Sequence, residues 1–365
     1  MLWSEAGKRI NPDKHRLIGN KNRMAIDKSK PIVVCAADEN YVKCLAVTAV
    51  SLLANCSRPQ DLTLVILDGG ISDLSRKRLC QSLEDFGAEI KWVIPNLPNV
   101  GYFPTSGHIS AVSYFRIFLG ELLPDSVLKL IYLDSDLVVD GDILDLWKIP
   151  FDGSVCIAAQ DLSAPYIDSQ LAAKNYPQYW RLLAATRPIP NYEVLGLQAD
   201  AEYFNAGVIS IDLETWRNDN LQQQLLTCFA CNDAHMLWWD QYLLNVVLQG
   251  RWKKLDPRWN QTPGIYNYAN WNHSPFDKET FENAIATPYI RHYASHVKPW
   301  HFGYMGPGRK DFFNYLDLTD WSGWRPSFDA VQLKKCFAYK FRDRLKLLKH
   351  QFEALSAVGA HSTKC

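Results

Sequence analysis

The sequence lacks several features that would place it at once in a class of protein. No uninterrupted apolar run reaches the roughly 18 to 20 residues that a membrane-spanning helix needs. The formal net charge of the 365 residues is zero, so no overall field draws the chain to nucleic acid. No G-x-G-x-x-G follows the first expected strand, which argues against a nicotinamide-dependent enzyme. We therefore expect neither a membrane-spanning protein nor a nucleic-acid partner.

A secreted, disulfide-linked domain is also disfavoured. The nine cysteines are scattered through apolar segments, and an odd number fits reduced thiols better than a disulfide framework. Residues 1–30 carry charges without an apolar stretch between them, unlike a signal peptide. We expect a location in the cytoplasm, either free or bound peripherally to the inner face of the membrane. The expected organisation is a basic extension at 1–30, one domain at 31–325 and a basic tail at 326–365.

What the sequence does contain is an alternation of short buried strands and amphipathic helices. Strands are predicted at 31–37, 62–67, 89–94, 127–133, 155–159, 207–213 and 286–291. Helices are predicted at 44–53, 75–86 and 110–122. This pattern predicts an α/β fold whose mostly parallel central sheet has helices on both faces. The aromatic, proline-bearing region after Trp239 lacks periodicity, and we expect it to be loop-rich and to lie over the site.

Two acids one residue apart, Asp134 and Asp136, directly follow a buried strand in LIYLDSDLVV (130–139). In open α/β sheets, ligands bind at the carboxyl ends of strands. Two carboxylates that face one cleft repel each other unless a cation neutralises them. Carboxylate oxygens suit Mg²⁺ or Mn²⁺, which commonly bridge to substrate phosphates. The alternative interpretation is a solvated loop that holds two acids.

A second cluster, HYASHVKPW (292–300), follows the short strand predicted at 286–291. A neutral imidazole would complete a site with Mn²⁺ preference, and Lys298 would offer a positive charge to a diphosphate. Spacing alone does not decide between His292 and His296. The alternative is a histidine packed against aromatic residues beside an exposed lysine.

Five ordered blocks carry a family resemblance. They are AADENY (36–41), HISAVSYFR (108–116), YLDSDLVV (132–139), YFNAGVISIDLETWR (203–217) and HYASHVKPW (292–300). In this order they resemble the retaining glycosyltransferases of family 8, the group of glycogenin, galactinol synthase and the bacterial lipopolysaccharide galactosyl- and glucosyltransferases. The lipooligosaccharide α-galactosyltransferases are especially similar. The resemblance covers roughly residues 31–303.

The resemblance implies a GT-A fold, with a Rossmann-like nucleotide-binding sheet, and an activity. The enzyme would transfer a hexose, glucose or galactose, from a UDP-sugar to a glycan or lipid-linked acceptor. It would depend on Mn²⁺ or Mg²⁺ and would act in lipopolysaccharide or cell-envelope glycan synthesis. The family position beneath the sugar holds an amide, Gln241, rather than a carboxylate. A front-side displacement therefore fits retention better than a covalent route.

The resemblance also implies site residues by position. The donor would contact Ala36, Asp38, Asn40, Tyr41, Arg116, Asp134, Ser135, Asp136, Asn205, Ala206, Gln241, Ser295 and Lys298. The metal ligands would be Asp134, Asp136 and His292. Asp161, Asp240 and Gln241 would surround the transferred sugar as catalytic residues, and His108 and Ser113 would lie near the acceptor. Ser295 stands where the family usually has glycine, which alters the backbone approach to the diphosphate.

The tail carries a separate signal. Between 332 and 352, apolar residues recur at helical spacing among lysines and arginines; they are Phe337, Phe341, Leu345, Leu348 and Phe352. A basic amphipathic helix of this kind is typical of proteins that bind an anionic membrane surface. The alternative is a helix that docks on the domain or in a dimer.

Two other functions compete with the transferase interpretation. Residues 134–138 (DSDLV) also match the D-x-D-x-[TV] motif of aspartate-nucleophile phosphatases. That motif normally opens the domain, and the downstream acidic pair of such enzymes is not evident here. A non-catalytic protein that binds sugar nucleotides or glycans is the second alternative. The intact set of Asp134, Asp136, His292 and Gln241 argues against it.

Overall fold

The computed structural model describes residues 26–97, 103–104, 111–172, 183–338, 340–342, 344–345 and 348. His108, Phe352 and residues 1–25 lie outside this part of the chain. Within it, no helix is both long and apolar enough to cross a membrane. The eight cysteines that it contains are free thiols, as their distribution predicted.

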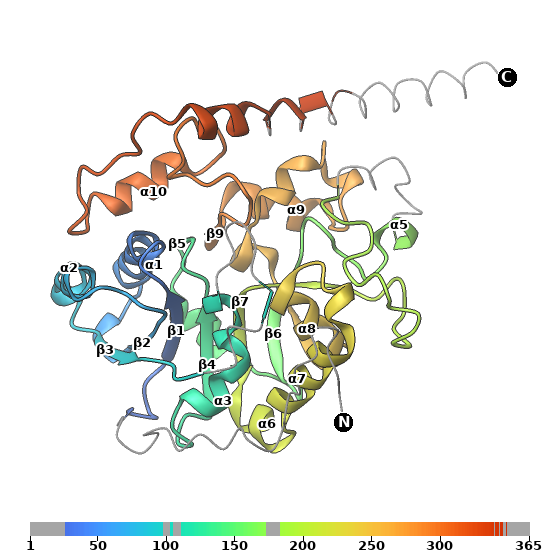
Figure 1. Ribbon diagram of the computed structural model, residues 1–365, viewed down its shortest axis with the longest axis horizontal. Coiled ribbons are helices and arrows are strands. Elements are labelled where there is room, and N and C mark those ends of the chain that lie inside the picture. Colours follow the sequence, from blue (N-terminus) through green and yellow to red (C-terminus); the bar gives the residue numbers. More distant parts are fainter. Residues whose placement is uncertain are drawn as a thin grey trace, which may run out of the picture.

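A seven-stranded sheet in the order β3-β2-β1-β4-β7-β6-β8 forms the centre of the molecule (Figure 1). Its strands are β1 (Ile32–Ala37), β2 (Thr63–Asp68), β3 (Glu89–Val93), β4 (Lys129–Leu133), β6 (Cys156–Gln160), β7 (Phe204–Asp212) and β8 (Trp252–Leu255). The first four in spatial order pair in parallel, as do β6 and β8, while β7 runs antiparallel to both of its neighbours. The mostly parallel α/β sheet expected from the sequence is confirmed.

Helices cover both faces of this sheet (Figure 1). One core contains side chains of α1 (Val42–Ala54), α2 (Asp73–Leu83), α4 (Ile143–Lys148) and α10 (Arg309–Leu316). The other contains side chains of α3 (Leu119–Leu122), α6 (Leu213–Asn218), α7 (Leu221–Asn232) and α8 (Trp239–Val247). Alternate residues of β1 enter the two cores, Val33 and Cys35 one, Ile32 and Val34 the other. This two-sided burial explains why the strand is apolar throughout.

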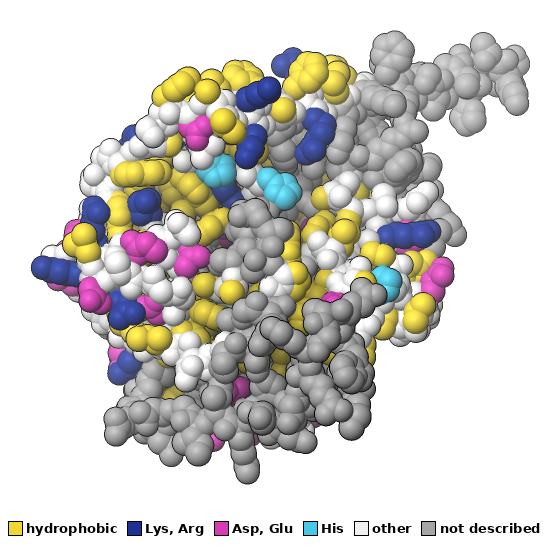
Figure 2. All heavy atoms as spheres, viewed as in Figure 1, with side chains coloured by type: hydrophobic (Ala, Val, Ile, Leu, Met, Phe, Trp, Pro, Cys, Tyr) yellow, Lys and Arg dark blue, Asp and Glu magenta, His cyan; other side chains and the backbone are white. Residues whose placement is uncertain are grey.

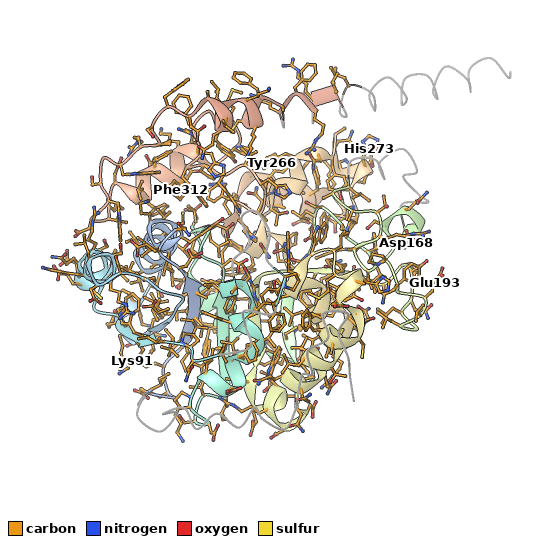
Figure 3. The ribbon with its side chains drawn as sticks, in the orientation of Figure 1. Lys91, Asp168, Glu193, Tyr266, His273 and Phe312 are labelled. Carbon is orange, nitrogen blue, oxygen red and sulfur yellow. The ribbon has the colours of Figure 1, made fainter. Side chains whose placement is uncertain are left out.

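The remaining elements are short. They are α5 (Ser169–Ala172), α9 (Lys278–Ala286), the paired strands β5 (Leu137–Val139) and β9 (Ile290–His292), and the 3₁₀ helices η3 (Pro59–Asp61), η4 (Glu84–Phe86), η6 (Ala111–Phe118), η9 (Asp233–His235), η10 (Pro257–Asn260), η11 (Pro263–Asn267) and η12 (Trp271–His273). Phe312 on α10, labelled in Figure 3, is 1% exposed, and its ring centroid lies 5.1 Å from that of Trp300. Helix α10 thereby supports the segment that follows β9.

The expectation of a loop-rich region after Trp239 is correct only in part. Loops and 3₁₀ turns do fill 256–273, but α8, β8 and α9 also lie in this region. Strand β8 (WKKL) is a four-residue edge strand in which only Leu255 is buried. It therefore shows neither an apolar run nor an alternation that would predict a strand.

Candidate active site

Polar side chains from several strands meet at one edge of the sheet. Because β1, β4 and β6 point the same way, their carboxyl ends share this edge, and Asp38, Asp134 and Asp161 directly follow them. The antiparallel β7 begins there, with Asn205 and Ala206. A cavity of about 620 Å³ opens at this edge, a volume ordinary for a small-molecule site.

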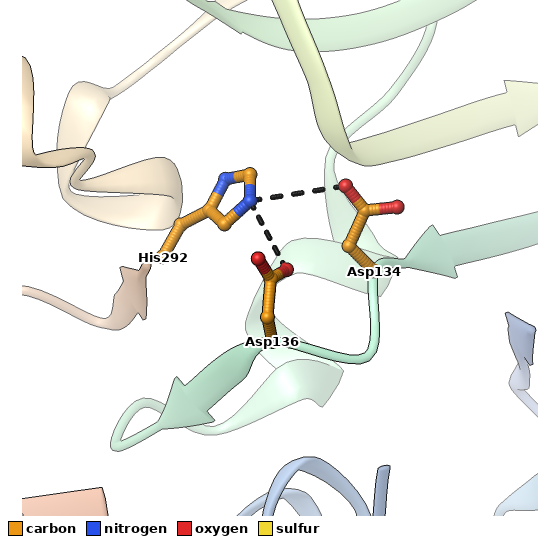
Figure 4. Close-up of side chains that lie close together, drawn as sticks. All are labelled: Asp134, Asp136 and His292. Carbon is orange, nitrogen blue, oxygen red and sulfur yellow. Dashed lines mark ion pairs between the residues drawn. The ribbon is translucent and has the colours of Figure 1, made fainter. Parts of the chain in front are cut away.

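Asp134, Asp136 and His292 converge in this cavity (Figure 4). Strand β5 follows the two acids and pairs antiparallel with β9, and the register sets Leu137 opposite His292. The Nε2 atom of His292 lies 3.3 Å from Oδ1 of Asp136 and 3.8 Å from Oδ2 of Asp134. One ligand atom from each residue lies within 4.8 Å of the others. One short strand pair therefore brings His292 beside two acids that lie far from it in the sequence.

A chain of hydrogen bonds determines which nitrogen of the His292 ring carries the proton. The carboxylate of Asp161 can only accept, and it accepts from Nδ2 of Asn205 at 2.9 Å. The Oδ1 atom of Asn205 in turn accepts from Nδ2 of Asn260 at 2.9 Å. Oδ1 of Asn260 then faces Nδ1 of His292 at 2.9 Å, so Nδ1 carries the proton.

The lone pair on Nε2 of His292 consequently faces two carboxylates. Three acceptors that approach this closely repel unless a second proton on the ring or a cation lies among them. Two carboxylate oxygens and one imidazole nitrogen, the latter oriented by an amide, form a donor set that suits Mn²⁺ or Mg²⁺. The residues present therefore fit a divalent cation.

Lys298 and Asp136 form a buried ion pair beside this cluster. The Nζ atom lies 2.6 Å from Oδ2 of Asp136 and donates to the carbonyl oxygen of Tyr293 at 2.7 Å. Burial acts to raise the pKa of Asp136, but the charge of Lys298 and then the contact with His292 outweigh it. The pKa of Asp136 is thus held well below its usual value, and the carboxylate is ionised and available as a ligand at neutral pH.

Arg116, carried by η6, joins two acids at the back of the cavity. Its Nη2 lies 2.7 Å from Oδ1 of Asp134 and its Nε lies 2.9 Å from Oδ2 of Asp240, while the guanidinium lies 4.5 Å from the ring centroid of Tyr132. Burial raises the pKa of Asp240 to about 6; Arg116 opposes that rise, and Asp134 adds to it. Among the acids of this cavity with a perturbed pKa, Asp240 is therefore the one that titrates closest to neutral pH.

Gln241 is fixed at both ends of its amide. Its Nε2 donates to Oδ2 of Asp161 at 3.0 Å, and its Oε1 accepts from the N–H of Ala206 at 3.1 Å. One turn further along α8, the buried Asn245 accepts from the N–H of Phe204 and donates to its carbonyl oxygen. Helix α8 is thereby clamped to the start of β7, and the amide of Gln241 points into the cavity with one orientation.

The structure brings most of the predicted site residues together. The residues that line the cavity are Ala36, Asp38, Tyr41, Ser113, Arg116, Asp134, Ser135, Asp136, Asp161, Asn205, Ala206, Asp240, Gln241, His292, Ser295 and Lys298. Asn40 is the exception, because it is exposed in the turn before α1 and its N–H donates to Asp38. His108 lies outside the described residues.

Several residues that line the cavity or support its side chains were not predicted from the sequence. Asn260, which orients His292, lies in the aperiodic region, where no spacing marked it. Trp238 and Trp239 also line the cavity; Trp239 has a φ of 46°, a left-handed conformation that a bulky residue adopts only under strain. Arg342 enters from the C-terminal helix, which the sequence analysis had treated as separate from the site.

Comparison with known proteins identifies the class to which this fold and site belong. Residues 32–303 match the profile of Glycosyl transferase family 8. The chain therefore belongs to glycosyltransferase family 8 and is a glycosyltransferase. The resemblance carried by the five sequence blocks is confirmed, and the phosphatase alternative is excluded.

Similar proteins match most of the length of this chain. General stress protein A of Bacillus subtilis (strain 168) is 28% identical over 82% of this chain and 97% of that protein. The lipopolysaccharide 1,2-glucosyltransferase of Escherichia coli (strain K12) is 25% identical over 88% of this chain and 86% of that protein. Galactosyltransferase LgtC, solved with donor and acceptor sugar analogues, aligns with a TM-score of 0.64 and 25% identity over 82% of this chain and 98% of LgtC. The GT-A fold is thereby confirmed.

Proposed function

We propose that this enzyme transfers a hexose, glucose or galactose, from a UDP-sugar to a glycan or lipid-linked acceptor, with retention of configuration. The observation that carries the proposal is the convergence of Asp134, Asp136 and His292 within 4.8 Å, beside the buried Lys298. Breaking the bond between a sugar and a diphosphate builds negative charge on the leaving oxygens, so a site that gathers positive charge there lowers the barrier.

The two aspartates and His292 would hold Mn²⁺ or Mg²⁺. A bound divalent cation would neutralise charge on the donor diphosphate and act as a Lewis acid. Lys298 would then exchange part of its contact with Asp136 for a contact with the diphosphate. Asn260 would keep the ring of His292 in the orientation that presents Nε2.

The donor would extend from the end of β1 to α8. Asp38 and the ring of Tyr41 would hold the uracil, with Asn40 at the rim, and Ser135 would lie near the ribose. Ala206 and Ser295 would approach the donor through their backbones.

The sugar would lie over Gln241, with Asp161 and Asp240 around it. An amide is too weak a nucleophile for a covalent route, and both ends of this amide are already hydrogen-bonded. Arg116 pairs with Asp240, which lowers the nucleophilicity of that carboxylate. These features support front-side displacement, in which the leaving phosphate accepts the proton of the acceptor hydroxyl.

The acceptor would enter near Ser113 and His108 and belong to lipopolysaccharide or another cell-envelope glycan. The name of the Escherichia coli relative supports this class of acceptor. Five large apolar side chains in the described part of the C-terminal helix are at least half exposed, namely Val331, Phe337, Phe341, Leu345 and Leu348. Figure 2 shows apolar and basic side chains gathered along the edge where Figure 1 places this helix. Peripheral binding to an anionic membrane on its cytoplasmic face would suit a lipid-linked acceptor.

A screen of sugar nucleotides tests the proposed activity. UDP-glucose and UDP-galactose should be hydrolysed slowly without acceptor in the presence of Mn²⁺, and a chelator should abolish the reaction. GDP-sugars should be poor donors. Hydrolysis that is equally fast with a chelator would contradict the metal requirement, and binding without any turnover would favour the non-catalytic alternative.

A further inference from the structure

The C-terminal helix, which begins at residue 330, is docked on the segment that carries Lys298. Cys336 is 4% exposed and packs with Val297. The Sγ–H of Cys336 donates to the carbonyl oxygen of Phe302 at 3.4 Å, and the N–H of Phe302 donates to Oε1 of Gln332 at 3.1 Å. These contacts fix the start of the helix against the cavity wall, as the alternative of a docked helix predicted.

Further along the same helix, Arg342 reaches the cavity. Arg342 and His296 both line the cavity and both are exposed, so they lie where it opens to solvent. Burial first, and then the charges of Lys298 and Arg342, lower the pKa of His296. The guanidinium is therefore close enough to the imidazole for its charge to be felt there.

The helix presents different chemistry on its different sides. At about 100° per residue, Arg342 lies within about 20° of Lys335 and about 160° from Arg344 around the helix axis. The charge of Lys335 contributes to lowering the pKa of His301, so this side of the helix faces the segment after β9. Phe337 and Phe341, by contrast, are 54% and 67% exposed. One side of the helix thus carries basic groups toward the cavity while another side exposes apolar residues.

Apart from Arg116, which pairs with Asp134 and Asp240, three basic side chains of the cavity come from other segments than its acids. The five carboxylates that line it follow strand ends or begin α8; they are Asp38, Asp134, Asp136, Asp161 and Asp240. Lys298, His296 and Arg342 come from the segment after β9 and from the helix docked on it. Two basic side chains at the opening, His296 and Arg342, beside acids that suit a divalent cation, are complementary to a phosphate group.

We propose that Arg342 and His296 form a phosphate-binding subsite at the opening of the active-site cavity, so that the C-terminal helix completes the active site. This inference rests on the proposed function, because the phosphate would belong either to the donor diphosphate or to a phosphorylated acceptor. Arg342 supplies the charge, and His296 supplies a hydrogen bond.

Calorimetric titration of the full chain with Mn²⁺ and UDP tests the donor source. Arg342→Gln should weaken UDP binding about three- to tenfold, the range expected for a partly exposed charge-assisted hydrogen bond. Binding of uridine, which has no phosphate, should stay unchanged. Arg344→Gln, on the opposite side of the same helix, is the matched control and should bind both ligands like the wild type.

Methyl phosphate, titrated into the protein saturated with UDP and Mn²⁺, tests the acceptor source. If the subsite serves the acceptor, Arg342→Gln should lose methyl phosphate binding and keep its affinity for UDP. A loss with either probe supports the subsite. No loss with either probe, or an equal loss in Arg344→Gln or with uridine, would overturn it. A wild-type chain that fails to bind UDP would instead refute the proposed function.

Discussion

At the residue scale, the site depends on which groups have hydrogen-bond partners and which do not. The amide of Asn260 has no titratable chemistry, yet it determines that the lone pair of His292 faces Asp134 and Asp136. Arg116 ties Asp134 to Asp240. The chemistry of each residue in the sequence motifs is thus set by neighbours that lie outside those motifs.

Asp240 should make the stability of the metal-free protein depend on pH. Its pKa is raised to about 6, chiefly by burial, whereas an aspartate in an unfolded chain titrates near about 4. As pH rises through this window the unfolded chain ionises first, so this group should lower the unfolding free energy by about 3 kcal/mol. The effect should be complete above the folded pKa and absent below the unfolded one.

Urea unfolding of wild type and Asp240→Asn with a chelator, from pH 4 to 7, measures this contribution. The stability difference between the two proteins should shift in favour of the variant as pH rises, because only the wild type ionises. Parallel pH profiles would show that Asp240 titrates normally. Added Mn²⁺ should weaken the effect, because a cation on Asp134 removes one cause of the raised pKa.

At the element scale, β7 passes directly behind the metal-binding cluster. A Cβ atom at Gly207 would lie 2.2 Å from Cε1 of His292 and 3.0 Å from Oδ2 of Asp134. No L side chain fits at that distance, so the strand needs glycine here for close approach. The short pair of β5 and β9 then brings His292 to the two acids.

Gly207→Ala should displace the His292 ring and break its contact with Asn260. We expect Mn²⁺ affinity to fall at least about tenfold, as for other changes that disturb the orientation of a ligand. Ser210→Ala, a buried change on the same strand, should leave Mn²⁺ affinity unchanged. Equal affinities for all three proteins by calorimetry would mean that the strand does not position the ring.

The elements that the sequence predicted well share one property, and those that it missed share another. Strands β1, β2 and β4 are buried on both faces and therefore read as apolar runs, which also placed Asp134 and Asp136 at a strand end. Asn260 and β8 owe their positions to contacts distant in sequence, and no local periodicity reports such contacts. The pairing of His292 with the two aspartates came from the family resemblance, because spacing left His296 open.

At the scale of the whole molecule, the C-terminal helix has two faces of different chemistry. We expected a domain at 31–325 and a basic amphipathic tail at 326–365, which would bind a membrane surface or dock on the domain or in a dimer. The contacts of Cys336 and Gln332 attach the start of the tail to the domain. We propose that the remaining exposed apolar face, centred on Phe337 and Phe341, binds the membrane.

The double variant Phe337→Ser/Phe341→Ser should lose binding to vesicles that contain phosphatidylglycerol, because it removes apolar area but keeps the docked residues. Removing the whole tail would also expose the surface under Cys336, so point variants are the cleaner test. Leu74→Ser, at a residue 69% exposed on α2, is the matched control. Cosedimentation of the double variant equal to that of the control would reject the membrane role.

The proposed activity requires one divalent cation held by Asp134, Asp136 and His292. Donor hydrolysis by Asp136→Asn, at saturating UDP-sugar and Mn²⁺, tests it most directly, with Asp145→Asn, at an exposed position of α4, as the control. We expect Asp136→Asn to lose at least about a hundredfold in rate, or about 2.7 kcal/mol in the barrier, and the control to be unchanged. A folded Asp136→Asn protein that turns over donor at the wild-type rate would contradict it.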